Sequence, residues 1–207
     1  MRLRMTVVIF ITILTLLVFG CNDNPPVVDN TTEYELPIRT ELEGNQYIYA
    51  LRSDGMAFKT QYSLGAQMVV DPDYYKTNSI MRGDVVYFQT DATREEIDSS
   101  RKMEFDVVRV IGLPGETVRI DRGQIYIDNR ELKAFYGNES FAHVGDLEPE
   151  RAMSMEEVTV PNGHYFLLGD LWLRNYNNSI VSGPISQDNI VGKVIGWTGK
   201  IETGRGG

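Results

Sequence analysis

The stretch Val107-Val-Arg-Val-Ile-Gly-Leu-Pro-Gly-Glu-Thr-Val118 decides the fold of this chain. Its first five residues are apolar except for Arg109, and they predict a buried β-strand over Asp106–Ile111. The following Gly112-Leu-Pro-Gly-Glu ends this run, because glycine and proline favour turns. The stretch therefore predicts a buried strand that leads through a tight turn into a second extended segment.

A β-hairpin follows directly. Thr117-Val-Arg-Ile and Gln124-Ile-Tyr-Ile each alternate between polar and apolar residues, and Asp121-Arg-Gly123 separates them. Gly123 stands where the turn needs a positive φ. Asp128-Asn-Arg130 marks a second turn after the hairpin.

Strand signals recur along the rest of the chain. We expect Pro161-Asn-Gly163 to join two of these strands as a hairpin, Glu157–Val160 with His164–Leu168. Thr93–Lys102 is expected to be a short helix or a loop, and its charges favour a solvated face. Phe135–Met153 lacks a clear hydrophobic period and is interpreted as an insertion. Together these strand and turn signals predict a mostly β single domain of antiparallel strands and hairpins with few helices. The remaining strands are predicted at Gln46–Leu51, Ala57–Tyr62, Asp84–Gln89 and Ile190–Trp197.

The composition limits the classes of partner. The 207 residues are enough for one domain with a sizeable core. A formal net charge of −9 disfavours a nucleic-acid partner, because an acidic surface repels phosphate backbones. His143 and His164 have no cysteine or histidine near them at ligand spacing, so we expect no metal site and no cofactor.

The single cysteine stands after an apolar N-terminal run. Met1-Arg-Leu-Arg is basic, Val7–Phe19 is uncharged, and Gly20 precedes Cys21. This layout is typical of a secretory signal and resembles a bacterial lipoprotein signal, in which the cysteine is lipidated and becomes the new N-terminus. The alternative is an uncleaved membrane anchor, although the run is shorter than the roughly 20 residues that a spanning helix needs. Both interpretations place the body of the protein outside the cytoplasm and on a membrane.

The domain organisation follows from these signals. We expect a lipoprotein-type signal peptide over 1–20, a flexible tether over 21–41, a folded β domain over 42–201 and a flexible tail over 202–207.

Several runs in this order resemble the conserved boxes of type I signal peptidases. Arg109 and Gly112-Leu-Pro-Gly-Glu resemble the segment after the catalytic lysine, and Arg82-Gly-Asp-Val-Val-Tyr-Phe88 resembles the family's "Gly-Asp-x-Val-x-Phe" strand. Val158–Asp170 and Ser182-Gly-Pro-Ile resemble the later boxes. The resemblance covers about residues 63–197 and implies the β-sheet domain shared by signal peptidases and LexA-like proteins.

The residues expected to carry the chemistry are replaced. In this family a serine attacks the scissile carbonyl and a buried, neutral lysine takes its proton. The lysine position is Val108, and the serine position is best matched by Gln67, which precedes Met68. In the third box Asn178 and Ser179 stand at the aspartate and serine positions. Because loss of such a nucleophile or its base typically costs on the order of a millionfold in turnover, the resemblance predicts a site that no longer cuts.

Three functions remain open. The first is a lipid-anchored, inactive family member that binds extended peptides of exported proteins or scaffolds an envelope assembly. The second is an active endopeptidase with relocated residues, for which Ser63 with Lys59 or Lys102 offers the nearest serine and lysines. The third is a structural envelope protein that reuses the fold. The candidate peptide-cleft residues are Ser63, Gln67, Met68, Val107, Val108, Arg109, Asp170, Asn178 and Ser179.

Overall fold

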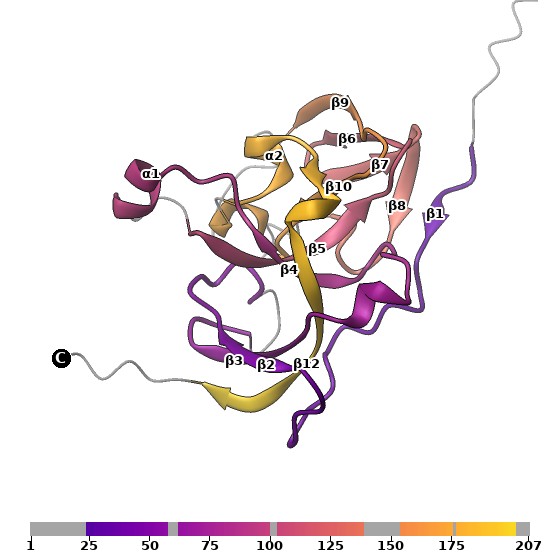
Figure 1. Cartoon of the computed structure of the whole chain (residues 1–207). Coiled ribbons are helices and arrows are strands. Elements are labelled where there is room, and N and C mark those ends of the chain that lie inside the picture. The colour runs from indigo at the N-terminus through magenta and orange to yellow at the C-terminus, as the bar shows by residue number, and fades with distance from the viewer. Residues whose placement is uncertain (1–23, 58–61, 100–102, 139–153, 176, 202–207) are drawn as a thin grey trace, which may run out of the picture.

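Two sheets of mostly antiparallel strands make up the protein (Figure 1). The computed structural model describes residues 24–57, 62–99, 103–138, 154–175 and 177–201. The larger sheet has the order β11-β10-β5-β4-β12-β3-β2, and the smaller has the order β1-β8-β7-β6-β9. Two short α-helices, α1 (Arg94–Asp98) and α2 (Ser179–Ser182), occur in the described part. The mostly β class expected from the sequence is confirmed.

The larger sheet is built around the stretch quoted first. Strand β5 runs over Phe105–Gly112 and pairs with β4 along its first half and with β10 along its second. Five of its eight residues have apolar side chains, and all but the first are buried, which is the pattern of a strand covered on both faces. The other strands are β2 (Tyr47–Ala50), β3 (Ala66–Asp71), β4 (Val85–Gln89), β10 (His164–Leu168), β11 (Ile185–Ser186) and β12 (Ile190–Ile201).

The smaller sheet contains the predicted hairpin. Strands β6 (Thr117–Asp121) and β7 (Gln124–Ile127) pair antiparallel, and Gly123 adopts a φ of 81° in their turn. Asp128 and Asn129 also adopt positive φ, and their two-residue turn leads into β8 (Arg130–Lys133).

One expected pairing is wrong. Strand β9 (Met155–Thr159) pairs with β6 in the smaller sheet, whereas β10 pairs with β5 and β11 in the larger one. Pro161-Asn-Gly163 therefore turns the chain from one sheet to the other, with Gly163 at a φ of 72°. Turn residues such as proline, asparagine and glycine predict that the chain changes direction. Which strands pair depends instead on how their apolar faces pack in the folded protein.

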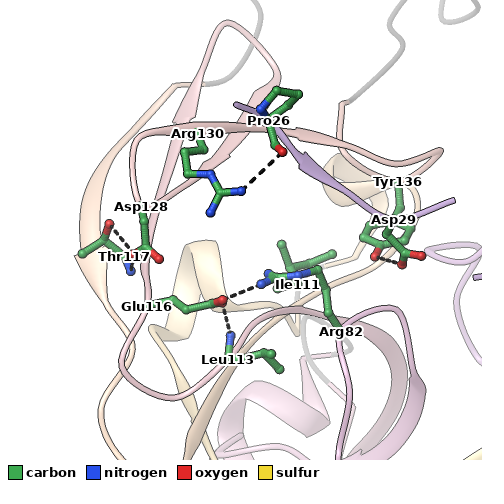
Figure 2. Close-up of polar contacts among 10 residues, drawn as sticks. All are labelled: Pro26, Asp29, Arg82, Ile111, Leu113, Glu116, Thr117, Asp128, Arg130 and Tyr136. Atoms are coloured by element: carbon green, nitrogen blue, oxygen red, sulfur yellow. Dashed lines mark hydrogen bonds and ion pairs between the residues drawn. The ribbon is translucent and has the colours of Figure 1, made fainter. Parts of the chain in front are cut away.

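Segment 24–39 lies against the domain, whereas a flexible tether was expected over 21–41. Strand β1 (Val27–Val28) pairs in parallel with β8. Arg130 donates to the carbonyl of Pro25 and also to that of Pro26, which Figure 2 shows. Beside this pair, Tyr136 donates to the carboxylate of Asp29 (Figure 2). We call residues 24–39 the strap.

The strap continues from the smaller sheet to the larger one. The amide of Leu36 donates to the hydroxyl of Tyr62, and the amide of Arg39 donates to the carbonyl of Trp197 in β12 (2.8 Å). Thr32 lies so close to Gly83 that a Cβ on the glycine would overlap its hydroxyl. The strap therefore joins both sheets along one side of the molecule (Figure 1).

Candidate functional site around strand β5

Val108, at the expected lysine position, lies in an apolar environment. It has no exposed surface (0%). A catalytic serine–lysine pair requires a hydroxyl and an amine within hydrogen-bond distance of each other, and the valine side chain supplies neither group. The side chains that cluster with Val108 are Ile80, Val86, Phe88, Val110, Tyr165, Leu167 and Ile185.

The expected serine position lies on another strand. Gln67 is on β3, and its amide oxygen accepts a hydrogen bond from Thr198 (3.0 Å). Met68 and Val107 are fully buried and share the core cluster between β3 and β5, so these two predicted cleft residues are brought together. Ser63 is half-buried in the turn before Gly65. Gln67 and Val108, by contrast, lie on strands β3 and β5, which are separated by β12 and β4 in the larger sheet.

Arg109 and Asp170 form a buried ion pair. Nε and Nη2 of Arg109 donate to Oδ1 and Oδ2 of Asp170, both at 2.8 Å, and Nη1 donates to the carbonyl of Gly83 (2.7 Å). The guanidinium also lies over the ring of Phe135, 4.8 Å from its centre. Burial by itself would lower the pKa of Arg109, and the carboxylate of Asp170 more than offsets this, so the pKa lies above its ordinary value. This pair fastens the loop after β10 to β5.

Asn178 and Ser179 organise the loop that follows. The Asn178 side chain accepts from the amides of Ile180 and Val181 and so caps α2 at its N-terminus. The hydroxyl of Ser179 accepts from the amide of Leu167 in β10 (2.8 Å). Both side chains are buried, and their bonds hold α2 against the larger sheet.

A buried acid that the sequence analysis passed over lies two residues before Val108. Asp106 is 2% exposed, and its carboxylate accepts hydrogen bonds from Asn177 (2.9 Å), Asn175 (3.3 Å) and Ser53 (3.5 Å). Burial raises the pKa of Asp106 above its ordinary value, although these hydrogen bonds act in the opposite direction. An acid at the start of an otherwise apolar strand was the signal that could have revealed it.

A cavity of about 530 Å³ opens beside the same end of β5. The rings of Tyr87 and Phe105 stack in it at 5.4 Å, and Tyr49 lies against Tyr87 at 4.6 Å. Burial, with the neighbouring Tyr47, raises the pKa of Tyr87 to about 12, so its hydroxyl stays protonated at neutral pH. The cavity offers an aromatic surface for an apolar side chain. Its lining residues are Tyr49, Arg52, Tyr87, Ile97, Met103, Glu104 and Phe105.

Some predicted features lie outside the described residues, namely Lys59, Lys102, the signal segment with Cys21, and the tail. Within the described ranges, no three histidine, cysteine, aspartate or glutamate residues are grouped to hold a metal ion. No helix in those ranges has the length and apolar character to cross a bilayer.

A family model described as "Signal peptidase, peptidase S26" matches residues 47–197, which is most of the chain. The chain belongs to this signal peptidase family. The match spans β2 to β12, and so it includes both the Arg109–Asp170 pair and the polar cluster of Asp106.

Named relatives agree with this assignment. Signal peptidase I V of Bacillus subtilis is 28% identical over 151 residues, which are 68% of this chain and 80% of that protein. A probable signal peptidase I-1 of Synechocystis is 30% identical over 63% of this chain, and signal peptidase I of Leptolyngbya laminosa is 31% identical over 62%. The chain spans 61% and 58% of the lengths of these two cyanobacterial relatives.

A solved structure is also similar. The crystal structure of a signal peptidase I from Enterococcus faecalis V583 shares 23% identity with this chain, covers 56% of it and 97% of its own length, and has a TM-score of 0.43.

Proposed function

We propose that this protein is a lipid-anchored, non-catalytic member of the signal peptidase I family that binds extended peptide segments of exported proteins. One observation carries the proposal. Val108, which the family pattern aligns with the catalytic lysine, is fully buried among apolar side chains and has no group that accepts a proton.

The partner position supports the same conclusion. Gln67 stands where the family has its nucleophile, and an amide nitrogen is not nucleophilic. Its oxygen is engaged by Thr198. Removing either member of such a pair typically reduces turnover by many orders of magnitude, so two replacements leave no useful activity.

Peptide binding does not need the lost groups. An extended peptide binds to a sheet edge through its backbone, and pockets for alternate side chains give specificity. The first half of β5 pairs with β4 on one side, and among the described strands none lies along its other side. The aromatic cavity next to this edge fits a large apolar side chain of such a peptide.

Anchoring is the remaining part of the proposal. A lipid on Cys21 would place the start of the strap three residues from the membrane attachment, and the domain would then lie close to the surface where exported chains emerge. The second candidate, an active enzyme using Ser63, rests only on that serine being half-buried near β3.

The test is a combined binding and cleavage assay on the full chain in detergent. A fluorescein-labelled peptide of alternating Ala and Leu with a Lys at each end is titrated for anisotropy, and the same mixture is analysed by mass spectrometry for fragments. We expect saturable binding and an intact peptide. Fragments that disappear in Ser63→Ala and Lys59→Ala would establish the active enzyme instead, and the absence of both binding and cleavage would favour a structural role.

A further inference from the structure

The edge of β5 along which no described strand pairs has a defined set of backbone groups. The amide of Val110 donates to the carbonyl of Asp84, and the carbonyl of Glu104 accepts from Thr90, so the even-numbered residues of β5 point toward β4. Backbone groups alternate in direction along an antiparallel strand. The N–H and C=O groups of Phe105 and Val107 therefore point away from β4, toward the side on which an added strand would bind.

Two side chains already bond to two of these four outward groups. Oδ1 of Asp106 accepts the N–H of Val107 at 2.8 Å. The hydroxyl of Tyr49 donates to the carbonyl of Phe105 at 3.0 Å. The carboxylate thus stands where the carbonyl of a bound peptide would lie, and the hydroxyl stands where a peptide N–H would lie.

The carboxylate of Asp106 is held in this position from two loops. Ser53 comes from the loop after β2, and Asn175 and Asn177 come from the loop after β10. The arrangement is not fully satisfied, because Oδ1 of Asn177 is buried and has no hydrogen-bond partner within the described part of the chain. Buried polar atoms are normally paired, so Oδ1 of Asn177 is a spare acceptor within this cluster.

We propose that Asp106 and Tyr49 are an internal plug on the peptide-binding edge of β5, which an extended peptide must displace in order to bind. This inference rests on the proposed function and adds regulation to the same site. The incoming strand exchanges the Val107–Asp106 and Phe105–Tyr49 hydrogen bonds for backbone bonds of its own. The net gain in binding free energy from each exchanged hydrogen bond is consequently small. The plug therefore disfavours peptides that contribute backbone hydrogen bonds but no side-chain contacts.

Tyr49→Phe gives the cleanest affinity test, because it removes the hydroxyl and keeps the ring that packs on Tyr87. We expect the labelled Ala–Leu peptide to bind this variant of the full chain about 2- to 10-fold more tightly than the wild type, the equivalent of one uncharged hydrogen bond. Tyr75→Phe is the matched control, since it removes a hydroxyl bonded to Asp84 on another part of the sheet. Equal dissociation constants for wild type and Tyr49→Phe would overturn the plug.

Hydrogen exchange provides a test that needs no peptide. We expect the amide of Val107 to exchange slowly in the wild type and at least 10-fold faster in Asp106→Ala, while the amide of Val110 is unchanged. Rapid exchange of Val107 in the wild type overturns the plug, and this arm holds even where Asp106→Ala does not fold. Slow exchange together with no peptide binding by any variant would retain the plug and refute the proposed function.

Discussion

Arg109 in β5 and Asp170 in the loop after β10 are joined by two parallel hydrogen bonds of 2.8 Å, and each side chain is 2% exposed. The two residues are 61 positions apart in the chain. A buried guanidinium is tolerated only with a matched acceptor, so the pair fixes the position of the loop that carries Asn175, Asn177 and Asn178. This link joins two of the segments that resemble the family's boxes.

Removing the acid of this pair should be costly. We expect Asp170→Ala to lower the free energy of unfolding by about 3–5 kcal/mol, because it leaves the charge of Arg109 buried without a partner. Denaturant unfolding measures the change. Asp98→Ala breaks the exposed Arg94–Asp98 pair of α1 and serves as the control, with an expected cost below about 0.5 kcal/mol. Similar losses for both variants would show that Arg109 finds another acceptor.

Restoring the family residues should not restore the enzyme. We expect Val108→Lys to lower stability by roughly 3 kcal/mol or more, because it places an amine among apolar side chains. Combined with Gln67→Ser it should still release no peptide fragments by mass spectrometry. Val181→Lys makes the same change at an exposed position of α2 and should cost no more than about 0.5 kcal/mol. Cleavage by the double variant would support the alignment of the two positions and would contradict the expectation that the apolar surroundings of Val108 exclude a working amine.

The strap should loosen in acid. Burial by itself raises the pKa of Asp29, but hydrogen bonds from Thr32, Tyr136 and Thr31 outweigh it, so the pKa lies well below its ordinary value of 3.8. A lowered folded-state pKa contributes stability that is complete above 3.8 and is lost as the pH falls through the folded value. We therefore expect Asp29→Asn to cost about 1–2 kcal/mol at neutral pH and progressively less below pH 3.8. Thermal unfolding across this range checks it, and a pH-independent difference would count against the assignment.

Asp106 should have the opposite pH dependence. Burial raises its folded-state pKa above 3.8, so its contribution to stability is fully present below that value and is lost as the pH rises through the folded pKa. We expect wild type to lose stability relative to Asp106→Asn as the pH increases above 3.8. The side chains that donate hydrogen bonds to it are those of Ser53, Asn175 and Asn177, all uncharged. A constant difference between the two proteins would mean that Asp106 is ionised throughout.

Local pattern was sufficient for much of the fold. The run after Val107 predicted β5, and alternation around Gly123 predicted the β6–β7 hairpin with its positive φ. Thr93–Lys102 was expected to be a solvated face, and α1 has no buried residue in it. These features depend on neighbours in sequence, which is why they were predictable.

Features that depend on distant partners were missed. Pro161-Asn-Gly163 predicted a turn, but it could not show that the strands on its two sides belong to different sheets. Thr32, Tyr34 and Leu36 face the domain at every second position, a period hidden by the polar residues between them. Asp106 was overlooked because the asparagines that bind it lie about 70 residues further along the chain.

The strap also determines how the protein responds to mechanical force. A pull on the N-terminus first loads the parallel β1–β8 pair and the hydrogen bonds from Arg130 to the carbonyls of Pro25 and Pro26. Figure 2 shows the bond to Pro26. Tension along β1 loads its bonds to β8 together. Force reaches Arg39 and β12 only after these bonds and the contacts of Asp29 with Tyr136 and of Leu36 with Tyr62 have broken. A domain pulled from its N-terminal side would therefore yield in the smaller sheet before the edge of β5 is disturbed.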